Sequence, residues 1–135
     1  MMGLPTETLD DIAGIAQLAE KIINLYFEQP NRPKGKGVEI SISVATFVPK
    51  PHTPFMLVPQ ATREQIAKKQ QHLIRSIPLK HKKRIRVSWN DQLVSLLEAV
   101  LARGDRRLSA VILKAWENGS RFDSWSDRFC WENWE

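Results

Sequence analysis

The sequence predicts an α/β fold, and three patterns in its 135 residues carry that prediction. Apolar residues alternate with polar ones over residues 38–44 and again over residues 84–89, which is typical of short strands. Apolar residues recur with helical spacing before, between and after these stretches, beginning with Ile12 and Ile15. A strand, a helix and a second strand in close succession form a βαβ unit, so the strands are expected to run parallel.

The first sixty residues hold this βαβ unit. Residues 1–5 are interpreted as the end of a buried strand that enters a tight turn. Thr8, with Asp11 three residues later, is a capping-box variant that predicts a helix ending before Pro30. The second strand covers residues 38–44, and the prolines that follow it exclude regular structure there.

Residues 61–135 are expected to form a separate, mainly helical module. Thr62 with Gln65 is a second capping box, and Pro78 closes the helix that it begins. A short strand over residues 84–89 follows, and Asn90 or Asp91 caps the next helix. Two apolar helices, which end at two glycines, then predict a helical hairpin with a tail rich in tryptophan; the glycines are Gly104 and Gly119.

Composition excludes several classes of protein. The chain has a net charge of +5 and one cysteine, Cys130. A single cysteine excludes an internal disulfide framework and a metal site built from several cysteines of this chain. No apolar run approaches the ~18 residues that a membrane helix needs, and no signal peptide is visible, so a cytoplasmic location without a membrane partner is expected. His72 and His81 have no ligand partner one helical turn away, so no metal site is predicted.

The positive charge is concentrated in one seven-residue stretch. It can be a solvated face, or it can contact a polyanion such as RNA, with Trp89 nearby to stack on a base. The candidate contact residues are Lys80, Lys82, Lys83, Arg84 and Arg86.

Two motifs resemble a known family. Met-Met-Gly-Leu-Pro-Thr-Glu-Thr at Met1–Thr8 resembles the strand-to-helix turn of radical S-adenosylmethionine (SAM) enzymes. Phe-Val-Pro-Lys-Pro-His-Thr-Pro-Phe at Phe47–Phe55 resembles the end of the next barrel strand in the same enzymes. Leu97–Arg107 and Arg121–Trp125 are similar to the region after the barrel in a bacterial subfamily that usually carries an N-terminal cobalamin-binding-type domain.

The resemblance implies a fragment of a larger enzyme. Residues 1–60 would be the last βαβ portion of a partial (β/α)6 barrel, and residues 61–135 would be a post-barrel module with a small strand and a helical hairpin. Such enzymes bind a 4Fe-4S cluster through a CxxxCxxC motif, which this chain lacks. The complete parent would cleave SAM reductively and abstract hydrogen from a substrate, and it could use cobalamin. This chain alone would bind no cofactor and would be inactive.

The resemblance also implies two sets of site residues. The turn would form part of the SAM-binding wall through Gly3, Leu4, Pro5, Thr6, Glu7 and Thr8. The mouth of the barrel, where such barrels build their sites, would present Phe47, Lys50, His52 and Phe55 to a substrate. The alternative interpretation of Lys50 and His52 is that they are solvated loop residues.

The expected partner of a fragment is the missing N-terminal part of the radical SAM protein. Its substrate would be an unknown small molecule or RNA. Two further hypotheses stay open: a stand-alone RNA-binding or protein-interaction module that uses the basic stretch, and a non-functional gene remnant. Exposed barrel edges would give a barrel fragment, functional or remnant, a tendency to self-associate.

Overall fold

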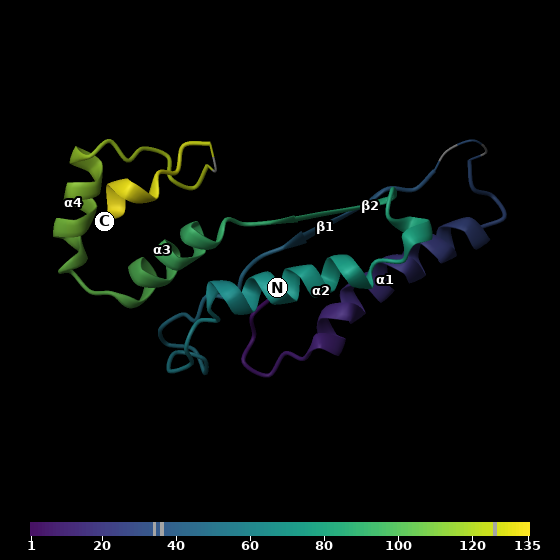
Figure 1. Cartoon of the computed structure of the whole chain (residues 1–135), viewed down its shortest axis with the longest axis horizontal. Helices are drawn as coiled ribbons and strands as arrows, with labels where there is room; N and C mark the ends of the chain where they lie inside the picture. Colours follow the sequence, from purple (N-terminus) through teal and green to yellow (C-terminus); the bar gives the residue numbers. More distant parts are fainter. Residues whose placement is uncertain (34, 36, 126) are drawn as a thin grey trace. The chain divides into compact units, whose positions relative to one another are not determined.

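The computed structural model describes residues 1–33, 35, 37–125 and 127–135. The helices and strands follow in the order shown in Figure 1: α1 (Leu9–Glu28), β1 (Ile40–Val44), α2 (Arg63–Ser76), the 3-10 turn η1 (Leu79–His81), β2 (Ile85–Trp89), α3 (Gln92–Arg103), α4 (Leu108–Glu117) and the 3-10 turn η2 (Trp131–Trp134). They form two compact units. The first unit joins Met1–Phe47 to Ala61–Trp89, and the second joins Val48–Gln60 to Asn90–Glu135.

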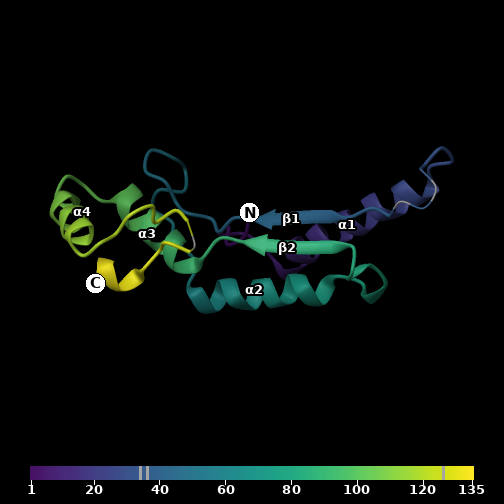
Figure 2. The same cartoon turned by 90° about the horizontal axis from the view of Figure 1, so that it is seen from above.

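The sheet of the first unit has two parallel strands. β1 and β2 pair in register from Ile40 with Ile85 to Val44 with Trp89, and both arrows point the same way in Figure 2. Met2 adds a single parallel bridge to Thr46, just after β1. The first predicted strand is therefore present as one bridge only, beside β1 and parallel to it.

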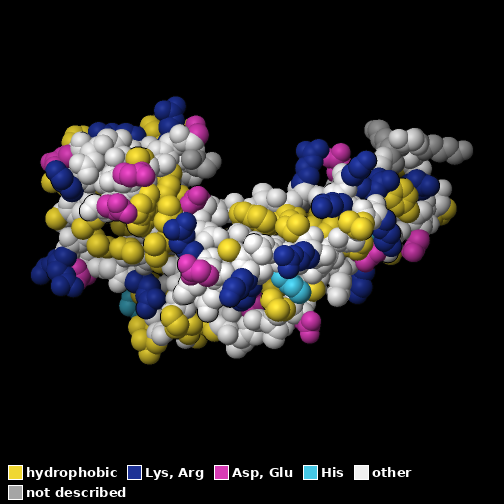
Figure 3. All heavy atoms as spheres, in the orientation of Figure 1, with side chains coloured by type: hydrophobic (Ala, Val, Ile, Leu, Met, Phe, Trp, Pro, Cys, Tyr) yellow, Lys and Arg dark blue, Asp and Glu magenta, His cyan; other side chains and the backbone are white. Residues whose placement is uncertain are grey.

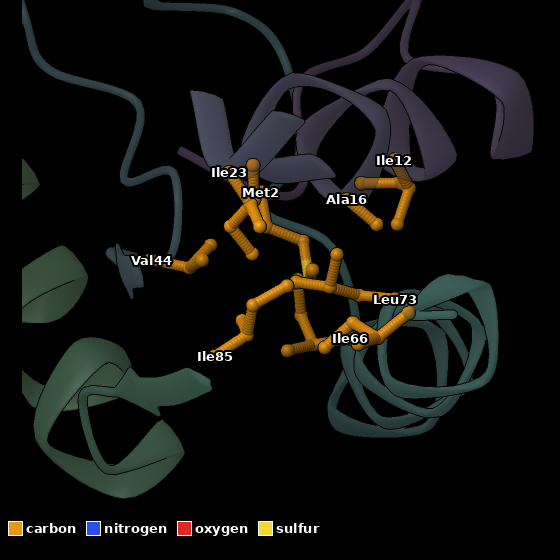
Figure 4. Packing of buried hydrophobic residues seen from close by; sticks show 10 residues of the cluster. Met2, Ile12, Ala16, Ile23, Val44, Ile66, Leu73 and Ile85 are labelled. Carbon is orange, nitrogen blue, oxygen red and sulfur yellow. The ribbon is translucent and has the colours of Figure 1, made fainter. Parts of the chain in front are cut away.

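The core of the first unit lies between the sheet and two helices. Both α1 and α2 lie on one side of the strands in Figure 1, and they carry the two capping boxes predicted at Thr8 and Thr62. Figure 4 shows side chains from both helices and from the strands meeting in this core. Its members include Met2, Ile12, Ile23, Val44, Ile66, Leu73 and Ile85, all of them buried. The helices thus cover one face of the sheet.

The chain passes from one compact unit to the other after residues 47, 60 and 89, so residues 61–89 belong with the first unit and residues 61–135 are not one compact unit. β2 pairs with β1, and α2 packs on α1, so residues 61–89 complete the first unit. The strand at residues 84–89 is thus not part of the module that follows. The physical reason is the hydrogen bonding and burial that β1 needs along its open edge, which an adjacent parallel strand supplies.

The second unit contains the remaining helices. Asp91 is the cap of α3, because its Oδ1 accepts hydrogen bonds from the backbone N–H groups of Leu93 and Val94. α3 ends at Gly104, and α4 packs against η2 near the end of the chain. Within the part of the chain that the structure describes, no helix combines the length and the apolar character that crossing a membrane requires.

Candidate functional site

The turn before α1 is held by the carboxylate of Glu7. Its Oε2 accepts a hydrogen bond from the backbone N–H of Gly3 at 2.8 Å and pairs with Lys69 Nζ at 2.6 Å. The Glu7 side chain is 6% exposed and the Lys69 side chain is 18% exposed, so water competes little for either charge. This ion pair ties the turn to α2 and sets its direction.

Gly3 meets a steric requirement inside the protein. Its φ of +98° lies in the left-handed region that favours glycine. A Cβ at this position would lie 2.9 Å from Ile66 Cδ1 and 3.4 Å from Ala61 Cβ. The resemblance implies that Gly3 belongs to a SAM-binding wall, whereas the close approach that the structure describes is to Ile66 of α2. A cofactor role of Gly3 stays a prediction.

The other turn residues differ in exposure. Leu4 is half-buried, whereas Pro5, Thr6 and Thr8 are exposed. Thr8 closes the capping box: its backbone N–H donates to Asp11 Oδ2 at 2.8 Å and its hydroxyl donates at 2.7 Å. These two bonds hold the pKa of the Asp11 carboxyl below its ordinary value, and the bond from the backbone N–H has the larger effect. Thr8 therefore has a complete structural role as a helix cap.

The predicted substrate mouth is divided between the two units. Phe47 is buried in the first unit, where its backbone N–H donates to Met2 O at 2.7 Å. Lys50, His52 and Phe55 belong to the second unit and are exposed. His52 has a φ of 59°, a left-handed conformation that costs roughly 1–3 kcal/mol in a residue other than glycine.

The loop 48–60 is fastened to α3 by three contacts within the second unit. Lys50 Nζ pairs with Glu98 Oε1. The Gln60 side-chain amide donates to Ser95 O at 3.2 Å, and Arg103 Nη1 reaches Val58 O at 3.4 Å. Lys50 is thus positioned by Glu98, a residue that the sequence did not single out as part of a site.

A hollow of about 680 Å³ lies beside Glu98 in the same unit. Apolar side chains of α3, including Leu97 and Leu101, share its wall with Asp123, Ser124 and Trp134. Asp123 Oδ1 and Trp134 Nε1 are buried and have no hydrogen-bond partner among the described residues. Glu98 and Asp123 lie in the two stretches that resemble the post-barrel region of the bacterial subfamily, and that resemblance was the one signal that could have marked them as neighbours.

The basic stretch is partly neutralised within the first unit. Lys80 Nζ lies 2.8 Å from Glu20 Oε1 and lowers the pKa of that carboxyl. Arg86 Nη2 lies 3.2 Å from Glu39 Oε2. Lys82 and Lys83 are exposed, and Arg84 is half-buried.

Cys130 makes a local contact with an acidic residue. Cys130 is exposed, and the hydrogen bond from its Sγ to Glu132 Oε2 raises the pKa of the thiol. A raised pKa keeps the thiol protonated and weakly nucleophilic. Across the described ranges, no group of three or more His, Cys, Asp or Glu side chains is placed to hold a metal ion.

The sheet has a second face that α1 and α2 do not cover. Alternate residues of a strand point to opposite faces, and the residues between the buried ones are exposed and polar. Ser41 lies opposite Arg86, and Ser43 lies opposite Ser88. This face is therefore hydrophilic over both strands.

Comparison with known proteins yields a distant relative. No family model matches the chain, and no solved structure matches it at a significant level. An uncharacterized protein of Methanocaldococcus jannaschii is 32% identical over 110 residues, which are 81% of this chain. The chain spans only 21% of the length of that protein.

Proposed function

We propose that the chain is part of a radical SAM iron-sulfur protein and contributes part of the SAM-binding wall and of the substrate mouth. The observation that carries the proposal is the order of three parallel segments, the Met2 bridge, β1 and β2, with both connecting helices on one side of the strands. Consecutive parallel strands with their helices on the outer face are the repeating element of a β/α barrel.

The polar face of the sheet supports the same proposal. In a barrel, the face opposite the helices points to the interior. Here that face carries Ser41, Ser43 and Ser88, together with the ion pair of Arg86 and Glu39. A hydrophilic interior suits a polar cofactor such as SAM better than an apolar core would.

The residues of this chain would act by shape and position. Leu4 and Pro5 offer apolar contacts for a wall, and the Glu7–Lys69 ion pair fixes the turn that carries them. Lys50, held by Glu98, offers an ammonium group to an anionic part of a substrate. In a complete parent, SAM and the cluster would supply hydrogen-abstraction chemistry.

The 4Fe-4S cluster does not fit this chain. Such clusters need several thiolate ligands, and the chain has one cysteine, which is exposed and hydrogen-bonded to Glu132. We therefore derive no step of the reaction from these residues. The M. jannaschii protein extends far beyond the matched region, so a longer parent is the context of the proposal.

The DNA that precedes the Met1 codon gives the first test. We expect it to encode, in the same frame, a CxxxCxxC segment and the earlier barrel strands. A second gene for those parts would serve equally well. If neither exists in the genome, the proposal is overturned and the interpretation as a gene remnant gains support.

A binding measurement on the complete protein gives the second test. Leu4→Arg should weaken SAM binding at least tenfold in equilibrium dialysis, because an arginine would enter the proposed wall. Leu18→Arg is the control, since Leu18 is 60% exposed on α1. Equal affinities of the two variants would exclude the turn from the SAM site.

A further inference from the structure

The amino-terminal ends of β1 and β2 border a second hollow, of about 590 Å³, that the proposed function does not use. Lys80, Lys83 and Arg84 line it together with one acid, Glu39. In Figure 3, Lys and Arg side chains (dark blue) gather at this end of the first unit. The hollow lies at the opposite end of β1 from Phe47, so it is independent of the proposed mouth.

Arg84 is held in place beside this hollow. Its guanidinium carbon lies 4.9 Å from the centroid of the Phe27 ring, a cation–π distance. Arg84 Nη1 also lies so near to Gly37 that a Cβ there would be 2.9 Å away. Gly37 thus leaves room for the guanidinium, and less side-chain entropy is lost when Arg84 binds a ligand.

A second guanidinium shares the same aromatic ring. The guanidinium carbon of Arg32 lies 5.0 Å from the centroid of Phe27. Among the described residues, no acidic side chain pairs with Arg32, Lys83 or Arg84. Lys83 and Arg84 therefore line the hollow without an acidic partner, and an anion placed between them would relieve their mutual repulsion.

The other charges of the basic stretch behave differently. Lys80 is paired with Glu20, and Arg86 is paired with Glu39 on the polar face of the sheet. Lys82 is exposed and does not line the hollow. Within the hollow, Lys83 and Arg84 carry positive charge that no acidic partner among the described residues compensates. Planar guanidinium groups favour ligands with several oxygens in one plane or around one centre, and phosphate is the common example.

We propose that this hollow binds phosphate groups through Arg84 and Lys83. A volume of about 590 Å³ accommodates more than one phosphate group. The phosphates can come from the backbone of single-stranded RNA or from a free nucleotide or pyrophosphate. The shared chemistry is the phosphate, and the experiment below separates the two sources.

The test uses the full chain and a fluorescein-labelled twelve-nucleotide oligouridylate at low salt, followed by fluorescence anisotropy. Lys83→Glu should weaken binding at least fivefold and lower the slope of log affinity against log salt by about 0.7–1. Arg84→Lys keeps the charge but loses the planar group, and it should weaken binding several-fold. The matched control is Lys68→Glu, an equal change of charge at an exposed position on α2 with an expected effect below twofold.

Competition identifies the source of the phosphate. Displacement of the oligonucleotide by millimolar pyrophosphate indicates a site for a free phosphorylated molecule, and resistance to it indicates an RNA backbone. The proposal is overturned if neither phosphate probe binds, if Lys68→Glu weakens binding as much as Lys83→Glu, or if polyglutamate competes as well as the oligonucleotide. Far-ultraviolet circular dichroism verifies that Lys83, an exposed residue, can be replaced without unfolding.

Discussion

The two units contain helices with similar apolar faces but cover those faces very differently. In the first unit, Ile12 and Leu73 are fully buried between the helices and the sheet. In the second unit, apolar residues of α4 such as Ile112 and Leu113 are 47% and 56% exposed. The comparison shows that helical periodicity predicts a helix and its apolar face, whereas a sheet or another partner is needed to bury that face.

The aromatic residues of the second unit illustrate the same difference. Trp116, Phe122 and Trp125 are each more than half exposed. Arg121 partly shields Trp116, with its guanidinium carbon 4.5 Å from the centroid of that ring. Exposed apolar surface of this kind is typical of contact regions. The self-association through exposed barrel edges concerns another part of the chain and stays a prediction.

The largest expected contrast between the units is in core packing. Leu73→Ala should lower the free energy of unfolding by about 2–5 kcal/mol, because it opens a cavity in the buried cluster that Leu73 shares with Ile12 and Ile66. Leu113→Ala in α4 should change it by less than about 0.5 kcal/mol, since Leu113 is already more than half exposed to water. Urea unfolding followed by circular dichroism measures both, and equal losses would contradict the comparison.

The second contrast concerns two ion pairs. Glu7→Gln should destabilise the first unit by about 2 kcal/mol, because it leaves Lys69 buried without a counter-charge. Glu98→Gln should cost no more than about 1 kcal/mol, since the Lys50 and Glu98 side chains are 46% and 51% exposed. Hydrogen exchange, read separately for α2 and α3, measures the two effects. A larger loss for Glu98→Gln would show that burial does not set the strength of these pairs.

The third prediction uses two glycines of the first unit. Gly3→Ala should cost about 1–2 kcal/mol, because the new Cβ is strained at a φ of +98° and meets Ile66. Gly14→Ala in α1 should instead stabilise by about 0.5–1 kcal/mol, since a Cβ there has no heavy atom within 4 Å. Thermal unfolding of the two variants should give shifts of opposite sign.

The smallest contrast is expected between helix caps. Thr8→Ala in the first unit and Asp91→Ala in the second should each cost about 1 kcal/mol, because a cap is a local interaction that does not depend on what covers the helix. Hydrogen exchange in the first turns of α1 and α3 measures both. A clear inequality would mean that the surrounding unit contributes to the cap.

The cap of α1 also predicts a pH dependence. The pKa of Asp11 is lowered in the folded protein, so its bonds to Thr8 stabilise the fold above pH 3.8, the ordinary pKa. That stability should disappear as the pH falls below 3.8 and through the lowered pKa. Asp11→Asn should remove this part of the pH profile, and an unchanged profile would exclude Asp11 as its source.

The boundaries that the sequence predicted well are those set by local chemistry. The helices α1 and α2 begin directly after the predicted caps, Thr8 and Thr62. Both predicted capping boxes, with Asp11 and Gln65 as their second members, are present. The sequence did not predict that residues 61–89 join the first compact unit, because nothing in residues 84–89 indicates which strand they pair with. The sequence pattern also did not predict that Glu98 and Asp123 line the same hollow, since the two residues lie far apart in the chain.

The sequence by itself determined the helices, the alternating strands and the concentration of basic residues, because each depends on residues a few positions apart. Only the tertiary structure decided that β2 joins β1, that Gly3 meets Ile66 instead of open space, and that Arg84 lies on Phe27. These contacts join residues separated by more than forty positions. Their formation depends on how much apolar surface and charge the folded chain can bury together, which no local pattern records.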